Sequence, residues 1–252
     1  MSTHKIDNKV KYAISDPIWQ IQEYNIDVSA HQIYLTGNEN YVLYEGNDNG
    51  EPGVDYSMAS RFIKNINILM RNNIGKPILI HMKTCGGDWS EGMAIHNMIQ
   101  ACPNPVTILS YTHARSMSSL IFQAANKRVM MPDSTFMFHD GTYGMEGTVK
   151  QVKSAIEFDS KSEERMLDIY TASMKRKGKY KDQSEAWIKK FLRSQMDKKE
   201  DVYLTAEEAV EWGLADEIFG KTMSYNWNKL IEYTSEELTY LDLTGETNEV
   251  TS

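Results

Sequence analysis

The chain has 252 residues, of which 41% are apolar and 25% charged; these values fit a folded globular protein and exclude a disordered, collagen-like or coiled-coil chain. Its formal net charge of -8 argues against binding of nucleic acid through the whole surface. Two cysteines, Cys85 and Cys102, are too few for a disulfide framework or a cysteine-rich zinc site, which favours a reducing compartment. The polar residues 1–12 show no secretory signal, and no apolar run approaches the roughly 20 residues that cross a bilayer, so we expect a cytoplasmic protein that binds no membrane.

Predicted strands and helices alternate along most of the chain. The pattern becomes strand-like from Ile18, and Ile26 and Val28 alternate as in a strand. Short apolar runs predict buried strands at 77–82, 106–110, 128–131 and 136–139. Apolar spacing predicts helices at 57–72, 92–102, 116–126 and 205–212. This rapid alternation indicates an α/β fold with a largely parallel sheet.

A longer helix is predicted from 148 to about 174. Apolar residues have helical spacing at both of its ends, whereas the stretch 157–165 is mostly charged. A helix with a polar middle is either solvated there or covered by a partner. The helix at 205–212 has clearer boundaries, because Thr205 and Glu208 have the spacing of a capping box and Gly213 is a natural C-terminal stop.

Four separate segments carry residues with possible chemistry. Ser116 follows a buried strand and begins a helix, so it is either a helix N-cap or a nucleophile beside free N–H groups and the positive end of the helix dipole. His139 ends one strand and Asp201 precedes another, and each residue alone is usually structural or solvated. A serine nucleophile, however, needs a base of this kind and a carboxylate of this kind. The pair Gly86-Gly87 after a strand allows either a plain turn or the close approach of a ligand.

In this order and spacing, the segments resemble the proteolytic subunit of the Clp protease, a self-compartmentalising serine peptidase. The matching segments are 33–37 (IYLTG), 84–87 (TCGG), 92–96 (GMAIH), 114–118 (ARSMS), 136–139 (FMFH) and 201–214 (DVYLTAEEAVEWGL). The resemblance covers about residues 31–219. It implies an α/β fold of the ClpP/crotonase-like spiral type, with repeated β-β-α units and a protruding long helix.

The resemblance also implies site residues and a reaction. Ser116 would be the nucleophile, His139 the general base and Asp201 the carboxylate that orients the histidine, in a serine endopeptidase without a metal or cofactor. The remaining implied site residues are Gly87 and Met117, whose backbone N–H groups would form the oxyanion hole, and Gly86, Gly141 and Gly144, which would lie beside the bound peptide.

The implied organisation has three parts. An N-terminal arm with the first strand (1–30) precedes the protease domain (31–219), and an acidic C-terminal extension (220–252) follows it. The protease domain contains an insertion (38–55) and a handle helix (148–175). The implied partners are a polypeptide substrate, further copies of the chain in stacked heptameric rings, and an AAA+ unfoldase ATPase; nucleic acid and membranes are not among them.

The chain departs from the family pattern near the site. Cys85 stands where the family has proline, Arg115 and Ser118 replace small residues around the nucleophile, and Asp140 with Gly141 follows the histidine. An acid beside the base either raises the pKa of the histidine or points to solvent. Three other functions stay open: a dedicated processing protease, for example in viral particle maturation, an inactive ring subunit, and a crotonase-like acyl-CoA enzyme.

Overall fold

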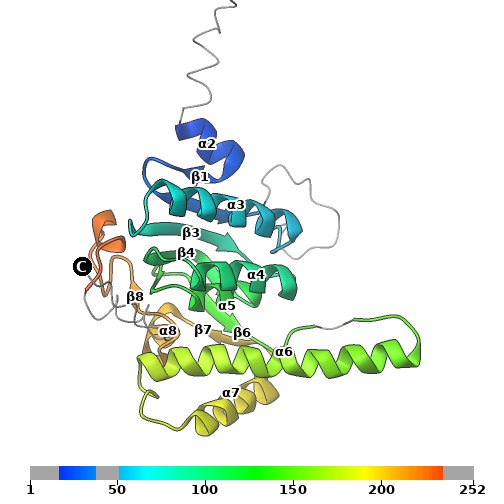
Figure 1. Cartoon of the computed structure of the whole chain (residues 1–252). Helices are drawn as coiled ribbons and strands as arrows, with labels where there is room; N and C mark the ends of the chain where they lie inside the picture. Colours follow the sequence, from blue (N-terminus) through cyan, green and yellow to red (C-terminus); the bar gives the residue numbers. More distant parts are fainter. Residues whose placement is uncertain (1–16, 38–50, 143, 235–252) are drawn as a thin grey trace, which may run out of the picture.

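The computed structural model describes residues 17–37, 51–142 and 144–234 (Figure 1). Within these ranges, eight strands form one sheet: β1 (Ile26–Asp27), β2 (Gln32–Thr36), β3 (Ile78–Thr84), β4 (Val106–Arg115), β5 (Lys127–Met130), β6 (Thr135–Phe138), β7 (Val202–Leu204) and β8 (Glu217–Ile218). The α-helices are α2 (Pro17–Tyr24), α3 (Tyr56–Asn72), α4 (Trp89–Gln100), α5 (Met117–Gln123), α6 (Val149–Arg176), α7 (Glu185–Lys199) and α8 (Ala206–Trp212). A short 3-10 helix, η1 (Trp227–Leu230), follows β8.

The sheet is largely parallel, as predicted. Its main path runs β1-β2-β3-β4-β5-β8, in which only the β1–β2 pair is antiparallel. The long strand β4 pairs with β5 through 107–110 and with β6 through 113–115, so the sheet branches along β4. Strand β7 then pairs with β6 in antiparallel fashion. The branch brings the last residues of β4 and β6 close to the first residue of β7.

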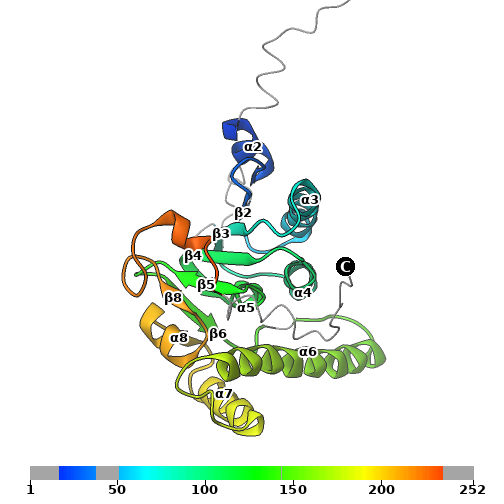
Figure 2. The same ribbon diagram turned by 60° about the vertical axis from the view of Figure 1, so that its left-hand side comes forward.

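Packed apolar side chains cover both faces of the sheet. Helices α3, α4 and α5 lie along one face (Figure 2), where Ile78, Ile80 and Met82 of β3 join the main core. Leu79, between them on β3, points to the opposite face and packs in a smaller cluster with Leu230 of η1. This alternation follows from the twofold side-chain period of a strand, and both faces are apolar because both are covered.

The long helix α6 confirms the helix predicted at 148–174, but its apolar positions have unequal environments. Leu167 and Met174, in the C-terminal half, are fully buried, whereas Val149 is 72% exposed and Ile156 is 53% exposed. Figure 1 shows the N-terminal half of α6 extending past the rest of the molecule. The sequence periodicity therefore identified the helix, while only its second half packs against the core.

Other boundaries differ from prediction for local reasons. The strand-like start at Ile18 is wrong, because 17–24 is helix α2; Pro17 occupies its first position, where a missing N–H costs nothing. Helix α4 starts at Trp89 rather than Gly92, since the Asp88 side chain accepts the N–H of Glu91 and caps it. Helix α7 was not predicted.

The capping box of Thr205 and Glu208 is confirmed, and Gly213 ends α8 in the left-handed conformation. Part of the predicted C-terminal extension packs on the sheet: Thr107 Oγ1 donates to the carbonyl of Leu230 at 2.5 Å and lies 2.6 Å from the hydroxyl of Tyr233. Most of the predicted insertion (38–50) and the tail beyond 234 lie outside the described residues. Among the described helices, none combines the length and the apolar character that crossing a membrane requires.

Candidate active site

Strand register explains why three distant segments meet. Arg115, the last residue of β4, pairs with Met137 of β6, and Ser116 N–H donates to the carbonyl of Met137 at 3.0 Å. In the antiparallel β6–β7 pair, Phe138 is opposite Val202. His139, one residue after Phe138, and Asp201, one residue before Val202, consequently leave the sheet side by side.

Ser116 occupies a strained backbone conformation at the start of α5. Its φ is 52° and its ψ is -130°, a combination that L-residues with a side chain rarely adopt and that clusters at functional sites. The residue holds the N-cap position, but its side chain makes no capping hydrogen bond. Its Oγ instead lies 2.8 Å from Nε2 of His139. Ser116 therefore stands at the N-cap position of the helix, but its hydroxyl bonds to His139 and does not cap the helix.

The imidazole of His139 links the hydroxyl to a carboxylate. Its Nδ1 lies 3.0 Å from Oδ1 of Asp201, so Ser116, His139 and Asp201 form one hydrogen-bonded row. The side chain of His139 is 24% exposed and that of Asp201 is 45% exposed, so the row runs from the molecular interior toward its surface. The second carboxylate oxygen of Asp201 accepts the Tyr203 hydroxyl at 3.4 Å.

Two buried serines fix the turn that carries Ser116. The Ser118 hydroxyl accepts the N–H of Arg115 at 2.9 Å and donates to the carbonyl of the same residue at 2.7 Å. The Ser119 hydroxyl donates to the carbonyl of Ser116 at 2.6 Å and lies 2.6 Å from the hydroxyl of Tyr170 on α6. Ser118 thus fills the space beside the nucleophile turn with a polar group that has its own partners, and it leaves no buried polar group unpaired there.

Glycine is required where the loop after β3 passes the serine. Gly86 has φ of 103°, and a Cβ added to it would lie 2.7 Å from the Ser116 Cβ and 3.0 Å from the backbone nitrogen of Met117. Gly87 forms a parallel bridge with Val54 through the carbonyl of Gly86 and the N–H of Asp88, which leaves the Gly87 N–H outside the bridge. The N–H of Met117 is the first of helix α5 and has no acceptor within the helix.

A cavity of about 1190 Å³ opens beside this row. The predicted site residues that line it are Gly87, Ser116, Met117, His139 and Gly141. The predicted site residues that are not among its described lining residues are Asp201, Gly86 and Gly144. Asp201 lies behind His139, and Gly86 lies behind Ser116; Gly144 is exposed, with no atom within 4 Å of the place a Cβ would take.

The sequence did not reveal the wall that α6 contributes to the cavity. Ala155, Phe158, Ser162, Met166 and Tyr170 of α6 line it at successive turns of the helix. Their spacing of three or four residues was present in the sequence, but the charged residues between them hid it. Leu120 of α5 and Trp89 of α4 also contribute to the apolar part of the wall.

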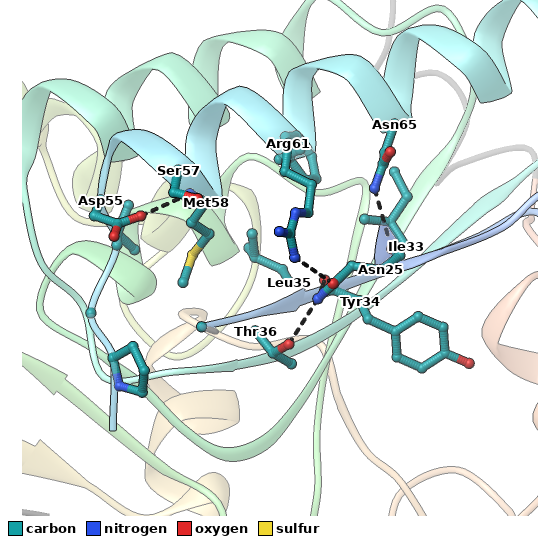
Figure 3. A pocket seen from close by; sticks show the side chains of 15 residues that line it. Asn25, Ile33, Tyr34, Leu35, Thr36, Asp55, Ser57, Met58, Arg61 and Asn65 are labelled. Atoms are coloured by element: carbon teal, nitrogen blue, oxygen red, sulfur yellow. Dashed lines mark hydrogen bonds between the residues drawn. The ribbon is translucent and has the colours of Figure 1, made fainter. Parts of the chain in front are cut away.

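A second cavity, of about 230 Å³, lies between β2 and α3 (Figure 3). Its polar groups bind one another: the Arg61 guanidinium donates to the Asn25 side-chain oxygen at 2.8 Å, and the Asn25 amide donates to the Tyr34 carbonyl and to the Thr36 hydroxyl. Asn65 donates to the carbonyl of Tyr24. This network attaches the β1–β2 segment to α3 and has the character of a structural contact.

The geometry of the first cavity defines a class of chemistry. A serine hydroxyl bonded to an imidazole that a carboxylate orients, next to unpaired N–H groups at a helix start, is the arrangement used for acyl transfer through a nucleophilic oxygen. The site thus contains the groups that acyl transfer requires, and an α/β fold carries them. Within the described residues, no group of three or more His, Cys, Asp or Glu residues is arranged to hold a metal ion.

Comparison with known proteins gives the family. A family model described as Clp protease matches residues 50–222, and the chain belongs to this protease family. The ATP-dependent Clp protease proteolytic subunit of Deinococcus radiodurans is 26% identical over 171 residues, which are 67% of this chain and 78% of that protein. The proteolytic subunit 3 of a Synechococcus species is 27% identical over 188 residues, covering 74% and 86% of the two chains.

The solved structures support the fold. A mutant of ClpP1 from Listeria monocytogenes superimposes with a TM-score of 0.60 at 20% identity, covering 81% of this chain and 96% of that chain. The predicted ClpP-like fold with a protruding long helix is therefore confirmed. Peptidase chemistry belongs to the family as a whole.

Proposed function

We propose that the chain is a serine endopeptidase that cleaves unfolded or delivered polypeptides. The observation that carries the proposal is the hydrogen-bonded row in which Ser116 Oγ lies 2.8 Å from His139 Nε2 and His139 Nδ1 lies 3.0 Å from Asp201 Oδ1. A row of this kind is the usual means of activating a weak hydroxyl nucleophile. Membership of the Clp protease family supports the same reaction.

In the proposed mechanism, Ser116 Oγ attacks the carbonyl carbon of a peptide bond while His139 Nε2 takes its proton. Asp201 holds the imidazole in the correct tautomer and stabilises the imidazolium that forms. The N–H groups of Gly87 and Met117 donate to the developing oxyanion. His139 then protonates the leaving amine, and water, activated by the same imidazole, releases the acyl group from Ser116.

The assembly belongs to the same proposal. Copies of the chain would form stacked rings that enclose the sites, with seven copies in each ring, and an AAA+ ATPase would deliver unfolded substrate to them in the cytoplasm. The exposed apolar residues Val149 and Ile156 on the projecting half of α6 support a further contact there, because unpaired apolar residues on one helix face commonly mark an interface.

The test is active-site labelling with a fluorophosphonate, followed by intact-mass and peptide mapping. We expect labelling at Ser116 in the wild-type protein and none in Ser116→Ala, with kcat for an unfolded substrate lowered about 10⁴–10⁶-fold. Ser160→Ala is the matched control, since Ser160 is an exposed serine of α6 that donates only to the carbonyl of Ile156. Equal peptide turnover by wild type and Ser116→Ala would overturn the proposal.

A further inference from the structure

The substrate cavity combines an apolar wall with carboxylates that are held in different ways. Asp88, Asp140 and Glu163 all line it. Asp88 caps α4 by accepting the N–H of Glu91 at 2.9 Å. Glu163 lies 3.4 Å from Nε of Arg193. Within the described residues, Asp140 has neither a hydrogen bond nor an ion pair, so its carboxylate is the lining acid without a partner.

Charges of both signs lie near Asp140, and the two like charges act on it more strongly than the two opposite charges. Glu163 and Asp197 both act on it as like charges, whereas the nearby positive groups are His139 and Arg193. Arg193 is itself shared, because its guanidinium pairs with Glu164 as well as with Glu163. Lys150 is the one lysine among the described lining residues of the cavity.

This environment disfavours the ionised form of Asp140. Although Asp140 is exposed, partial desolvation, followed by the charges of Glu163 and Asp197, raises the pKa of its carboxyl above the ordinary value, and the opposing effects of His139 and Arg193 are smaller. A carboxylate that is destabilised by its neighbours gains from any cation that approaches it. His139 and Arg193 supply part of that charge, and the open cavity beside Asp140 leaves room for a further cation.

The apolar part of the cavity supplies the other half of the recognition. Phe158 and Met166 of α6 line the wall, together with Leu120 of α5, and Ser116 and His139 lie on the same cavity. Long basic side chains bury their methylene stems on apolar surface while the charged end stays at a polar or wet position. The cavity offers these two environments beside the nucleophile.

We propose that Asp140 is a specificity-determining residue, and that this cavity accepts a lysine or arginine side chain on the substrate residue whose carbonyl Ser116 attacks. The stem of that side chain lies along the apolar wall, and its cationic end pairs with the Asp140 carboxylate. The inference rests on the proposed peptidase function and adds a substrate class to it.

The test uses the full chain in its native assembly and two peptidyl diphenyl phosphonates. The two probes differ only in the side chain next to phosphorus, which is the aminobutyl group of lysine in one and the butyl group of norleucine in the other. The measured quantity is the ratio of their second-order rate constants for labelling Ser116, followed by intact mass. Because both probes react with Ser116 in the same way, a change in the reactivity of Ser116 or His139 alters both rate constants equally and cancels in the ratio.

We expect the wild-type protein to favour the lysine probe about 2- to 5-fold, the range for an ion pair that is partly exposed to water. Asp140→Asn should bring the ratio close to one. Asp133→Asn, which changes an exposed aspartate in the turn between β5 and β6 outside the cavity, should keep the wild-type ratio. A wild-type ratio at or below one, or an unchanged ratio in Asp140→Asn, would overturn the inference.

A fluorophosphonate without a peptide separates the two levels of proposal. If the fluorophosphonate labels Ser116 but the wild-type protein does not favour the lysine probe, the proposed substrate class is wrong and the peptidase function stands. If neither the fluorophosphonate nor the peptidyl probes label Ser116, the peptidase function fails, and the inference about Asp140 fails with it.

Discussion

At the scale of single residues, hydrogen bonds at the backbone N–H and at the carbonyl of Ser116 hold the residue in its strained conformation. Its N–H is fixed by the carbonyl of Met137, and its carbonyl accepts the hydroxyl of Ser119. These contacts come from β6 and α5, so strand pairing and helix formation compensate for the cost of a positive φ. The hydroxyl is thereby held toward His139, away from the capping position that helix starts normally favour.

The close approach of Gly86 to this turn leads to a prediction. In Gly86→Ala, the added methyl group would meet Ser116 Cβ at 2.7 Å and the Arg115 carbonyl at 2.8 Å, so one of the two segments must move. Since displacements of about 1 Å cost roughly 100-fold in enzymatic rate, we expect fluorophosphonate labelling of Ser116 to slow by at least about 100-fold.

Gly75→Ala is the matched control for backbone strain. Gly75 also has a positive φ, of 82°, but no atom lies within 4 Å of the place its Cβ would take. The control should lose about 1 kcal/mol of unfolding free energy and keep the wild-type labelling rate. Equal labelling rates in Gly86→Ala and Gly75→Ala would show that contact with the serine turn is unimportant.

At the scale of elements, a buried ionic network joins the start of β5 to the ends of α6 and α8. The Arg128 side chain is fully buried and binds both carboxylate oxygens of Asp216, at 2.8 and 3.0 Å. It also donates to the carbonyl of Gly213, at the end of α8, at 3.0 Å. Arg176, the last residue of α6, adds a second guanidinium 3.1 Å from Asp216.

The network predicts a stability that depends on acid pH. Burial alone would raise the pKa of Asp216, but the charge and hydrogen bonds of Arg128, assisted by Arg176, outweigh it and lower the pKa to about 2. Because the folded-state pKa lies below the unfolded value, this stabilisation is complete above about pH 4 and is lost as the pH falls toward 2. Urea unfolding should find Asp216→Asn about 3 kcal/mol less stable than wild type at pH 7.

The difference in unfolding free energy between wild type and Asp216→Asn should narrow as the pH falls from about 4 to about 2. Asp168→Asn serves as the control, since Asp168 pairs with Lys189 at the surface and its side chain is half exposed. That variant should change stability by less than about 1 kcal/mol. If the difference in unfolding free energy between wild type and Asp216→Asn is independent of pH, the Asp216 carboxylate is not the source of the acid sensitivity.

The sequence predicted elements well where one signal dominates. Strands β3, β4 and β5 follow from short apolar runs, and α8 follows from its capping box and Gly213. Helix α7 was missed although Ser184 caps it and Ile188, Leu192 and Met196 are buried at intervals of four residues. Lysines and arginines between them dilute the apolar pattern that would have indicated the helix.

The site was predictable as a set of candidates and not as a geometry. Ser116, His139 and Asp201 could be singled out from local context and from the family resemblance. Their meeting depends on the register of β6 against β7, which a single sequence does not specify. The role of Asp140 as a lining residue was hidden for the same reason, since the positions of Glu163 and Arg193 follow only from the docking of α6 and α7.

At the scale of the whole molecule, the projecting half of α6 has exposed apolar residues that no described part of the chain covers. Ile156 is 53% exposed there. If copies of the chain associate through this helix, Ile156→Lys should raise the dissociation constant of the assembly about 10- to 100-fold, because it removes the burial of one isoleucine from each contact. Light scattering across a dilution series measures this change as a fall in particle mass.

Ile74→Lys is the corresponding control, since Ile74 is 76% exposed in the turn after α3. It introduces the same charge away from α6 and should leave the mass profile as in wild type. A monomer at micromolar concentration in the wild-type protein would contradict the proposed rings. Equal dissociation of the two variants would show that α6 is not the contact.

The chain leaves the sheet at His139 and comes back to it at Asp201, directly beyond Phe138 and Val202, the last pair of the β6–β7 ladder. Helices α6 and α7 therefore form an excursion whose two ends are fixed by neighbouring backbone hydrogen bonds. Lengthening or shortening that excursion leaves the spacing of imidazole and carboxylate unchanged. Evolution can consequently remodel the substrate wall and the projecting helix without disturbing the acid–base pair on which they depend.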